Sequence, residues 1–312
     1  MTLFHQTLKL LILSSIPNPH TNNFKLGLVP RYVMDLVFSD IHADLNALDA
    51  IIDTVTSEEF VKQYGAFSRI INLGDLLERG IYPKQVISKL KTLEQNYPIF
   101  SVIGNHDEGF LSGKKVSASS FESMDAHQKL TDEDLSFFKQ NKDGTFGSLE
   151  YIDKTNGLFC VHGGPLDPKK ITPKNANDEA WLYQRNWQRL TDEGFEFFSY
   201  HGYHYTASSA FDEVKKHVQN HIILCGHQHM ETAISNQDDK VQEIYSSIKP
   251  KQEKIAGHIL ERKEIEIQSK TDYFIRLGLA GPAGYYGVGK AVPHFGIIQY
   301  NPKKVILFNV NP

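Results

Sequence analysis

The segment Asp35-Leu36-Val37-Phe38-Ser39-Asp40-Ile41-His42 places two polar side chains directly after a short apolar run. Four later segments repeat this arrangement, with apolar runs at 69–73, 99–103, 158–161 and 222–225. In chain order, the five polar motifs are Asp40-Ile41-His42, Gly74-Asp75 with Arg79-Gly80, Gly104-Asn105-His106-Asp107, His162-Gly163-Gly164 and Gly226-His227-Gln228-His229. Together they supply aspartate, asparagine and histidine in the number and chemical type needed to hold two divalent metals.

The apolar runs predict parallel strands that are covered on both faces, because each is short, rich in β-branched residues and ends in Gly, Asn or Asp. In open α/β sheets, ligands collect outside the carboxyl ends of the strands, where loops can carry polar groups. We therefore expect the five motifs to converge on one rim.

The segments between the first three motifs have apolar residues at the spacing of a helix. Apolar residues at helical spacing predict a helix over 45–55 with Asp44 as its cap, and a second helix that begins near Pro83 and ends before Pro98. This order of strand, motif and helix predicts a βαβ opening. The longer segments near 109–148, 165–220 and 231–270 exceed usual connections and are expected to be insertions in a single domain over 34–312. Within the last, residues 264–268 alternate like a half-exposed strand.

Composition excludes several classes of protein. The chain has 312 residues, of which 40% are hydrophobic and 22% charged, as is ordinary for a globular protein. Its net charge of -4 gives no reason to expect nucleic-acid binding. The apolar stretch within residues 1–33 is too short to span a membrane, and we expect a poorly ordered tail there. Cys160 and Cys225 lie inside apolar runs, which favours buried packing in a reducing, cytoplasmic compartment over a metal or redox role.

Two further segments resemble binding motifs. Residues 284–290 have the spacing of a phosphate-binding P-loop, but Ala291 replaces the Ser or Thr that would hold magnesium and Pro293 would break a following helix. We expect a glycine-rich loop that borders the site. The run Tyr200-His201-Gly202-Tyr203-His204-Tyr205 has no acidic or cysteine neighbour, so aromatic packing or substrate stacking is favoured over a metal site.

The five motifs resemble the signature of the calcineurin-like metallophosphoesterase superfamily. The segment from Gly74 to Gly80 and the motif at His162 are also similar to the phosphoprotein phosphatase branch, whereas residues 39–48 look closer to small bacterial and archaeal phosphodiesterases of the superfamily. The resemblance implies an α/β fold, a four-layer α/β/β/α sandwich with two mixed sheets. It covers the chain from about Met34 to the end.

The resemblance also implies a ligand set for two metals. Asp40, His42, Asp75 and His229 would hold one ion, and Asp75, Asn105, His162 and His227 the other, with Asp75 as the bridge. The resemblance to the family implies Mn as the first choice of metal, and Fe, Zn, Ni or Co also suit these ligands. The nucleophile would be a hydroxide bound between the two metals.

The same resemblance assigns catalytic roles. His106 would protonate or stabilise the leaving oxygen, oriented by Asp107 or by Glu78, where the phosphoprotein phosphatases have an aspartate. The planar guanidinium group of Arg79 would donate two hydrogen bonds to phosphate oxygens, and Asn105 would also contact the substrate. Arg185 loosely resembles a second phosphate-binding arginine, and a helical surface charge is the equal alternative.

The expected reaction is hydrolysis of a phosphate ester. A phosphorylated small molecule, a nucleotide or a phosphoprotein would be the substrate, with phosphomonoester hydrolysis favoured over phosphodiester or dinucleoside polyphosphate cleavage. A non-catalytic scaffold of the same fold is disfavoured because all predicted ligands and His106 are present.

Overall fold

The computed structural model describes residues 34–114, 119–285 and 290–311. The predicted N-terminal tail, residues 1–33, lies outside the described residues, as do residues 286–289 of the predicted glycine-rich loop. In the described ranges no helix has the length and apolar character needed to cross a bilayer.

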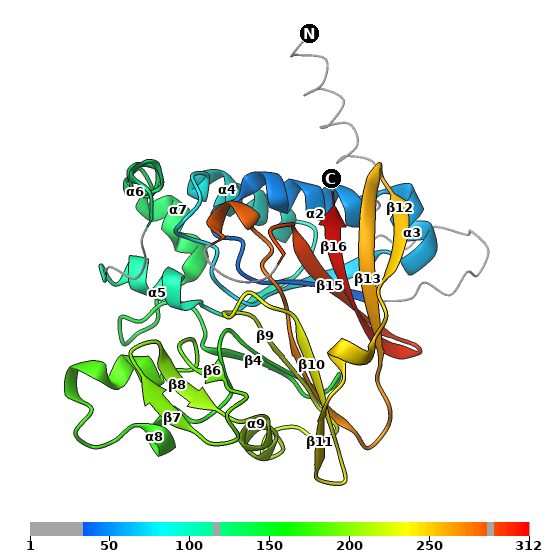
Figure 1. Cartoon of the computed structure of the whole chain (residues 1–312). Helices are drawn as coiled ribbons and strands as arrows, with labels where there is room; N and C mark the ends of the chain where they lie inside the picture. The colour runs from blue at the N-terminus through cyan, green and yellow to red at the C-terminus, as the bar shows by residue number, and fades with distance from the viewer. Residues whose placement is uncertain (1–33, 115–118, 286–289, 312) are drawn as a thin grey trace. The chain divides into compact units, whose positions relative to one another are not determined.

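Seven strands form the larger sheet (Figure 1). In spatial order they are β12 (Lys251–Ile255), β13 (His258–Glu266), β16 (Lys303–Asn311), β15 (His294–Tyr300), β1 (Met34–Phe38), β2 (Phe67–Asn72) and β3 (Ile99–Ser101). The pairs β1–β2 and β2–β3 are parallel, as expected for strands that precede motifs, and the other pairs are antiparallel.

Six strands form the second sheet, which is also mixed. Their order is β11 (Lys240–Glu243), β10 (Thr232–Gln237), β14 (Asp272–Arg276), β9 (Ile222–Cys225), β5 (Leu158–Val161) and β4 (Glu150–Asp153). The neighbours β14, β9 and β5 are parallel, so the two motif strands β5 and β9 point the same way. A small third sheet contains β6 (Arg189–Leu190), β8 (Gly202–Tyr205) and β7 (Phe197–Ser199).

The predicted early helices are present. The side chain of Asp44 accepts the Ala47 N–H at the start of α2, and Pro83 opens α4. The α-helices are α2 (Leu45–Thr56), α3 (Glu58–Tyr64), α4 (Pro83–Glu94), α5 (Asn105–Leu111), α6 (Phe121–Gln128), α7 (Asp132–Leu135), α8 (Pro168–Ile171) and α9 (Ala207–Val214). Short 3-10 helices occupy Ser136–Phe138, Asn177–Tyr183, Tyr245–Ser247 and Pro282–Gly284.

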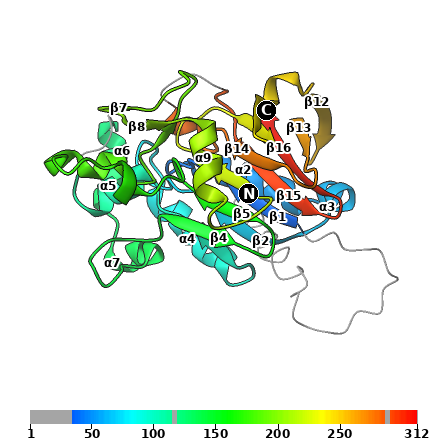
Figure 2. The same ribbon diagram turned by 90° about the horizontal axis from the view of Figure 1, so that it is seen from below.

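Successive side chains of a strand point to opposite faces of its sheet, and the buried hydrophobic residues form three clusters. In β1, Leu36 and Phe38 pack with α2, α3 and α4 on the outer face of the seven-stranded sheet, while Val37 faces the other sheet. Cys160 lies in that inter-sheet cluster, and Cys225 lies in a third cluster under α9. Figure 2 shows α9 over the face of the six-stranded sheet. The predicted fold class, with two mixed sheets between outer helices, is confirmed.

The three long segments adopt different structures. Residues 109–148 form α6, α7 and a hairpin-like turn, and residues 165–220 form α8, the small sheet and α9. Residues 231–270 supply β10 and β11 to one sheet and β12 and β13 to the other. The predicted half-exposed strand over 264–268 corresponds to the end of β13, where Ile265 is buried and Glu266 is exposed.

Candidate functional site

The backbone of the motifs is strained. The φ angle is 58° at Asp40, 56° at Asp75 and 67° at His227, in a region that residues other than glycine seldom adopt. The same sign of φ occurs at His42, Ala43, Glu78, Arg79 and His229. Each such conformation costs on the order of 1 to 3 kcal/mol and persists where surrounding contacts determine it. This strain lies where polar side chains follow the strands, which indicates a functional site.

Two motif glycines let neighbouring loops approach closely. A Cβ atom on Gly104 would lie 1.9 Å from Asp75 Oδ1, and one on Gly226 would lie 2.4 Å from Asp40 Oδ2. Both distances are far inside van der Waals contact, so no other residue fits without displacing a carboxylate. Glycine therefore sets where the two carboxylates sit.

The structure brings the predicted metal ligands together from both sheets. Among the described residues, three overlapping groups of buried side chains place their possible ligand atoms within 4.8 Å of one another. They are Asp40, His42 and His229; Asp75, His162 and His227; and His42, Asp75 and His106. The first two groups match the two predicted sites, and the predicted amide ligand, Asn105 Oδ1, lies 3.0 Å from His162 Nε2.

His162 shows that the site suits a cation. Its Nδ1 donates to the Leu73 carbonyl over 2.7 Å, which fixes the tautomer and leaves the Nε2 lone pair directed inward. That Nε2 lies 3.0 Å from Asn105 Oδ1 and 3.2 Å from Asp75 Oδ2. Three electron-pair donors this close repel one another unless a proton or a cation lies among them.

His42 repeats this arrangement in the other group. Its Nδ1 donates to the Leu77 carbonyl over 3.2 Å, and its Nε2 lies 3.2 Å from His229 Nε2 and 3.7 Å from Asp75 Oδ2. His229 Nε2 lies 3.3 Å from Asp40 Oδ1. Asp75 is thus within reach of both groups, as the predicted bridge requires.

Three buried ligand atoms lack a hydrogen-bond partner among the described residues: Asp40 Oδ1, Asp75 Oδ2 and His227 Nε2. An unsatisfied buried polar atom costs about 1 to 3 kcal/mol, and more when the group is charged. Divalent cations would satisfy all three atoms. The donor set of imidazole, carboxylate and amide, without thiolate, fits such ions.

The charges of the site are interdependent. Burial opposes ionisation of Asp40, but His229, whose Nε2 lies 3.3 Å from Asp40 Oδ1, lowers the Asp40 pKa to about 2. Burial also disfavours a charged His162, yet the Asp75 carboxylate raises the His162 pKa to about 9. Burial holds the pKa of His42 and of His227 well below the usual range. A cation bound near Asp75 would replace the proton on His162.

His106 lies beside the ligand groups and pairs with Glu78. Its Nδ1 is 2.7 Å from Glu78 Oε2, and its backbone N–H donates to Asp75 Oδ1 over 2.9 Å. The His106 and His42 ring centroids are 4.9 Å apart. Because Nδ1 faces the carboxylate, Nε2 is the ring atom available to the site, and Arg79 Nη2 lies 3.1 Å from it.

Asp107 has different partners. Its carboxylate accepts backbone N–H groups from Asp75, Leu76 and Leu77 over 2.9 Å each, and from Gly104 over 3.1 Å. These four bonds tie the turn after β2 to the start of α5. In the described part of the chain, the Asp107 carboxylate makes no hydrogen bond to His106.

Residues of the first long segment contact the turn that contains Glu78 and Arg79. His127 of α6 accepts the Glu78 N–H through Nε2 over 2.7 Å, while its Nδ1 donates to the Ser123 carbonyl. Ser119 Oγ accepts the Arg79 N–H over 3.1 Å, and the Arg79 side chain donates to the Gly284 carbonyl. Glu78 and Arg79, both at positive φ, are thus fixed by residues distant in sequence.

The two arginines of the 165–220 segment have different surroundings. Arg185 donates to the Glu150 carboxylate and to the Pro165 carbonyl, and its guanidinium lies 5.7 Å from the Phe159 ring centre. Arg189, on β6, donates through Nε to the His201 carbonyl over 2.7 Å. Burial lowers its pKa to about 10, Asp75 opposes that shift, and Arg79 adds to it.

Sequence reasoning missed Arg189. Its position follows from β6, because the Leu190 N–H donates to Gln228 Oε1, between the two histidines of the last motif. The sequence offered a signal, since Arg185 and Arg189 flank the short run Asn186-Trp187-Gln188, but it did not show which arginine would interact with Asp75. His201 and His204 belong to none of the three possible metal groups among the described residues.

Comparisons with known proteins indicate the family of this chain. A family model described as calcineurin-like phosphoesterase matches residues 36–231, which include all five motifs. An uncharacterised protein of Methanocaldococcus jannaschii, MJ0912, is 32% identical over 83 residues, which is 27% of this chain and 30% of that protein.

Solved structures share the fold. A metallophosphoesterase from Sphaerobacter thermophilus has a TM-score of 0.54 at 18% identity, with 90% of this chain and 89% of that chain covered. A protein serine/threonine phosphatase from Saccharomyces cerevisiae has a TM-score of 0.48 at 15% identity, with 90% and 80% covered, and we draw no functional argument from it. The family match spans more than half of the chain and contains the whole set of candidate ligands, so this chain belongs to the calcineurin-like phosphoesterase family.

Proposed function

We propose that this protein is a binuclear metallophosphoesterase that hydrolyses a phosphate monoester carried by a small molecule, a nucleotide or a protein. The observation that carries the proposal is the convergence of Asp40 Oδ1, Asp75 Oδ2 and His227 Nε2, which are buried without a hydrogen-bond partner among the described residues. The strained backbone at the same three residues supports a functional role.

Seven side chains would hold the metals. Asp40, His42, Asp75 and His229 would bind one ion, and Asp75, Asn105, His162 and His227 the other. We propose Mn first, and Fe, Zn, Ni or Co fit the same donors. When bound, two divalent ions activate water and stabilise negative charge on the attacking and leaving oxygens of a phosphate.

His106 would deliver the proton to the leaving oxygen. Glu78 holds its Nδ1, so a proton on Nε2 points into the site and can pass to the departing alkoxide or aryloxide. In the structure, which holds no substrate, Arg79 Nη2 lies 3.1 Å from His106 Nε2. A bound phosphate would draw the Arg79 guanidinium to its oxygens and leave Nε2 free to carry the proton.

Two guanidinium groups favour a monoester over a diester. The charge of Arg189 interacts with Asp75 and with Arg79, and Arg79 Nη2 lies 3.1 Å from His106 Nε2. Two divalent ions, two aspartates and one hydroxide leave a formal charge of about +1, so the arginines help to neutralise a dianionic monoester. A diester carries one negative charge less. Phosphodiester or dinucleoside polyphosphate cleavage is the second candidate.

The test is hydrolysis of aryl phosphate monoesters and diesters by the full-length protein, first after chelation and then with added Mn. His106→Asn is the diagnostic variant, and His258→Asn, at the start of β13, is a matched control. We expect metal-dependent turnover with the monoester preferred, lost in His106→Asn and kept in the control. Equal turnover with chelated protein, or normal turnover by His106→Asn, would contradict the proposal.

A further inference from the structure

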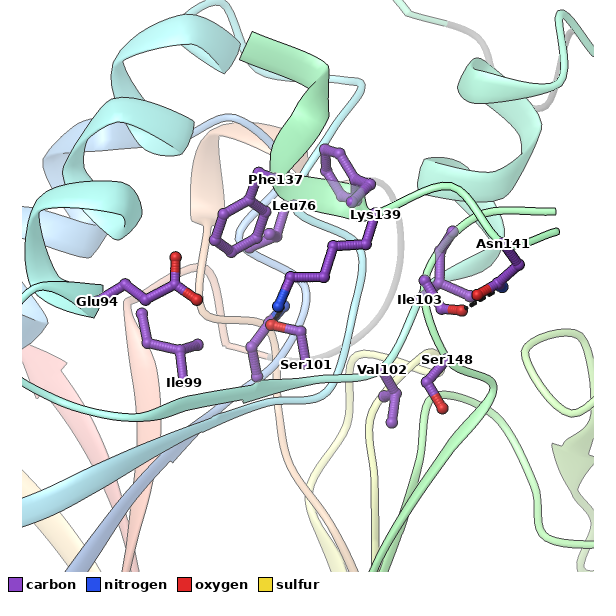
Figure 3. Close-up of a pocket in the computed structure, with 13 residues that line it drawn as sticks. Leu76, Glu94, Ile99, Ser101, Val102, Ile103, Phe137, Lys139, Asn141 and Ser148 are labelled. Atoms are coloured by element: carbon purple, nitrogen blue, oxygen red, sulfur yellow. Dashed lines mark hydrogen bonds between the residues drawn. The ribbon is translucent and has the colours of Figure 1, made fainter. Parts of the chain in front are cut away.

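Two places beside the metal-site loops have no role in the reaction described above. One is a hollow of about 250 Å³ beside β3, whose lining includes Glu94 and Lys139 (Figure 3). Both of these residues are exposed, so water satisfies their charges and they indicate no ligand. The other is the contact between Gln228, in the last motif, and Leu190 of β6, where polar groups of the protein bind one another directly. This contact bears on the position of Arg189.

The Gln228 side chain pairs with β6 as a neighbouring strand would. Its Oε1 accepts the Leu190 N–H over 2.8 Å, and its Nε2 donates to the Leu190 carbonyl over 3.1 Å. β6 has two residues and lies at the edge of the small sheet, where β8 pairs with it on the other side. A carboxamide has the same kinds of donor and acceptor as a peptide group, so it can satisfy both backbone groups of one strand residue. Gln228 therefore completes the outer edge of β6.

Arg276 of β14 determines which way the Gln228 amide faces. Its Nη1 donates to Gln228 Oε1 over 2.7 Å, and its Nε donates to the Met230 carbonyl over 2.7 Å. A guanidinium group has donors only, so the amide oxygen must face it, and the amide nitrogen then faces the Leu190 carbonyl. Arg276 is buried, and Leu190 is buried in the third hydrophobic cluster. Buried residues on both sides thus hold Gln228 in one orientation.

Arg189 is the residue of β6 that this contact would position. It directly precedes Leu190, and its Nε donates to the His201 carbonyl over 2.7 Å. A guanidinium that is bonded at Nε still has the donors of its two terminal nitrogens for phosphate oxygens. The charge of Arg189 also interacts with Asp75, the proposed bridging ligand. A shift of β6 would therefore move this guanidinium relative to the metal ligands.

We propose that Gln228 is a positioning residue for phosphate binding and that it acts through Arg189. The residues on either side of it, His227 and His229, are predicted metal ligands, so one short loop would set the position of both the metals and this guanidinium. Glutamine suits the position because glutamate would place a second carboxylate oxygen against the Leu190 carbonyl, and methionine would make neither hydrogen bond. This role rests on the phosphate binding proposed for Arg189.

The test is the binding of inorganic phosphate to the full-length protein reconstituted with Mn, measured by isothermal calorimetry. Arg189→Met should weaken phosphate binding by about tenfold, and Gln228→Met by about fivefold, because the guanidinium is then less well placed. Gln242→Met, at an exposed glutamine of β11, is the matched control and should bind phosphate like wild type. An unchanged phosphate affinity in Gln228→Met would overturn the proposal.

A double-mutant cycle shows whether Gln228 acts through Arg189. The protein with both Arg189→Met and Gln228→Met should bind phosphate about as weakly as Arg189→Met alone, because methionine at 189 has no charge to position. Effects that multiply would show that the two residues act independently, which would overturn the proposal. Gln228→Glu should give an intermediate affinity, since it keeps the acceptor for the Leu190 N–H and loses the donor to the Leu190 carbonyl.

Two further measurements separate positioning from other roles. The Mn content of Gln228→Met should equal that of wild type, and a loss of Mn that matches the loss of phosphate affinity would assign Gln228 to the support of the metal ligands instead. In metal-free protein, hydrogen exchange of the Leu190 amide should be about tenfold faster in Gln228→Met, and unchanged exchange would contradict the contact itself.

The phosphate titrations also distinguish failure of this proposal from failure of the proposed function. Equal phosphate affinity in wild type and Arg189→Met would contradict the phosphate-binding role of Arg189, and the positioning role of Gln228 with it. Weaker binding in Arg189→Met without any change in Gln228→Met would overturn the positioning role alone. Because these titrations need no turnover, they decide between the two even if no substrate is hydrolysed.

Discussion

The loops of the seven-stranded sheet and those of the six-stranded sheet contribute different chemistry to one site. The loops after β1, β2 and β3 of the seven-stranded sheet carry both carboxylates, the amide, one imidazole and the proposed proton donor. These residues are Asp40, His42, Asp75, Asn105 and His106. Those after β5 and β9 carry imidazoles: His162, His227 and His229. One sheet thus supplies the negative charge and the other supplies imidazoles, so a bound cation would take ligands from both sheets.

The opposite end of the same strands shows what a link made by the protein alone looks like. Arg69 of β2 donates to Asp35 of β1 over 2.7 Å and to Asp153 of β4, in the other sheet, over 2.7 Å. There one arginine joins two carboxylates across the sheets, and each carboxylate has hydrogen-bond partners in the protein. At the motif end the side chains leave buried acceptor atoms without a hydrogen bond among the described residues, as expected for a link that a metal would complete.

The largest effect is expected where the sheets share one ligand. Asp75→Asn should lower turnover by about 10⁴-fold, because this carboxylate reaches both ligand groups. Initial rates on an aryl phosphate with saturating Mn would measure it, with Asp178→Asn, an exposed aspartate, as the control. Turnover within tenfold of wild type would show that Asp75 does not bridge.

Removing the proton donor should affect turnover while sparing the metals. His106→Asn is expected to reduce kcat by about 10³-fold, as for loss of a general acid, with metal content unchanged. Steady-state kinetics and metal analysis of the same preparation would check both parts. A loss of metal equal to the loss of rate would assign His106 to the ligands instead.

The roles of Glu78 and Asp107, the two acids near His106, can be distinguished because the two carboxylates have different hydrogen-bond partners. Glu78→Gln should lower kcat by about 10- to 100-fold, because it no longer holds the charged form of His106, and should leave the melting temperature near that of wild type. Asp107→Asn should lower the melting temperature, because an amide nitrogen then faces backbone N–H groups. The reverse pattern would make Asp107 the orienting acid.

The smallest effect is expected from Arg189, the arginine on β6 of the small third sheet. Arg189→Met should lower kcat/KM for a monoester by about tenfold through a higher KM, and should lower it less for a diester. Arg185→Met, whose guanidinium contacts Glu150 and Pro165, should change kcat/KM by less than about threefold. A larger effect at Arg185 would contradict this ordering.

The motif strands were predictable because local patterns determine them. The apolar runs before Asp40 and His162 became β1 and β5, and Asp44 caps the helix predicted from its spacing. Side-chain direction in the long segments was not predictable, because it depends on distant partners. The Arg185 side chain donates to the Glu150 carboxylate, and His127 Nε2 accepts the Glu78 backbone N–H. The roles of Glu78 and Asp107, adjacent to motif residues, likewise depend on tertiary contacts.

The central claim is that two metals join the two sheets through Asp75. The most direct measurement is the metal content of protein reconstituted with Mn and desalted, by elemental mass spectrometry, for wild type, His106→Asn and Asp75→Asn. The account predicts two ions per chain in wild type and in His106→Asn, and fewer than two in Asp75→Asn. A wild-type content below two, or two ions retained by Asp75→Asn, would contradict it.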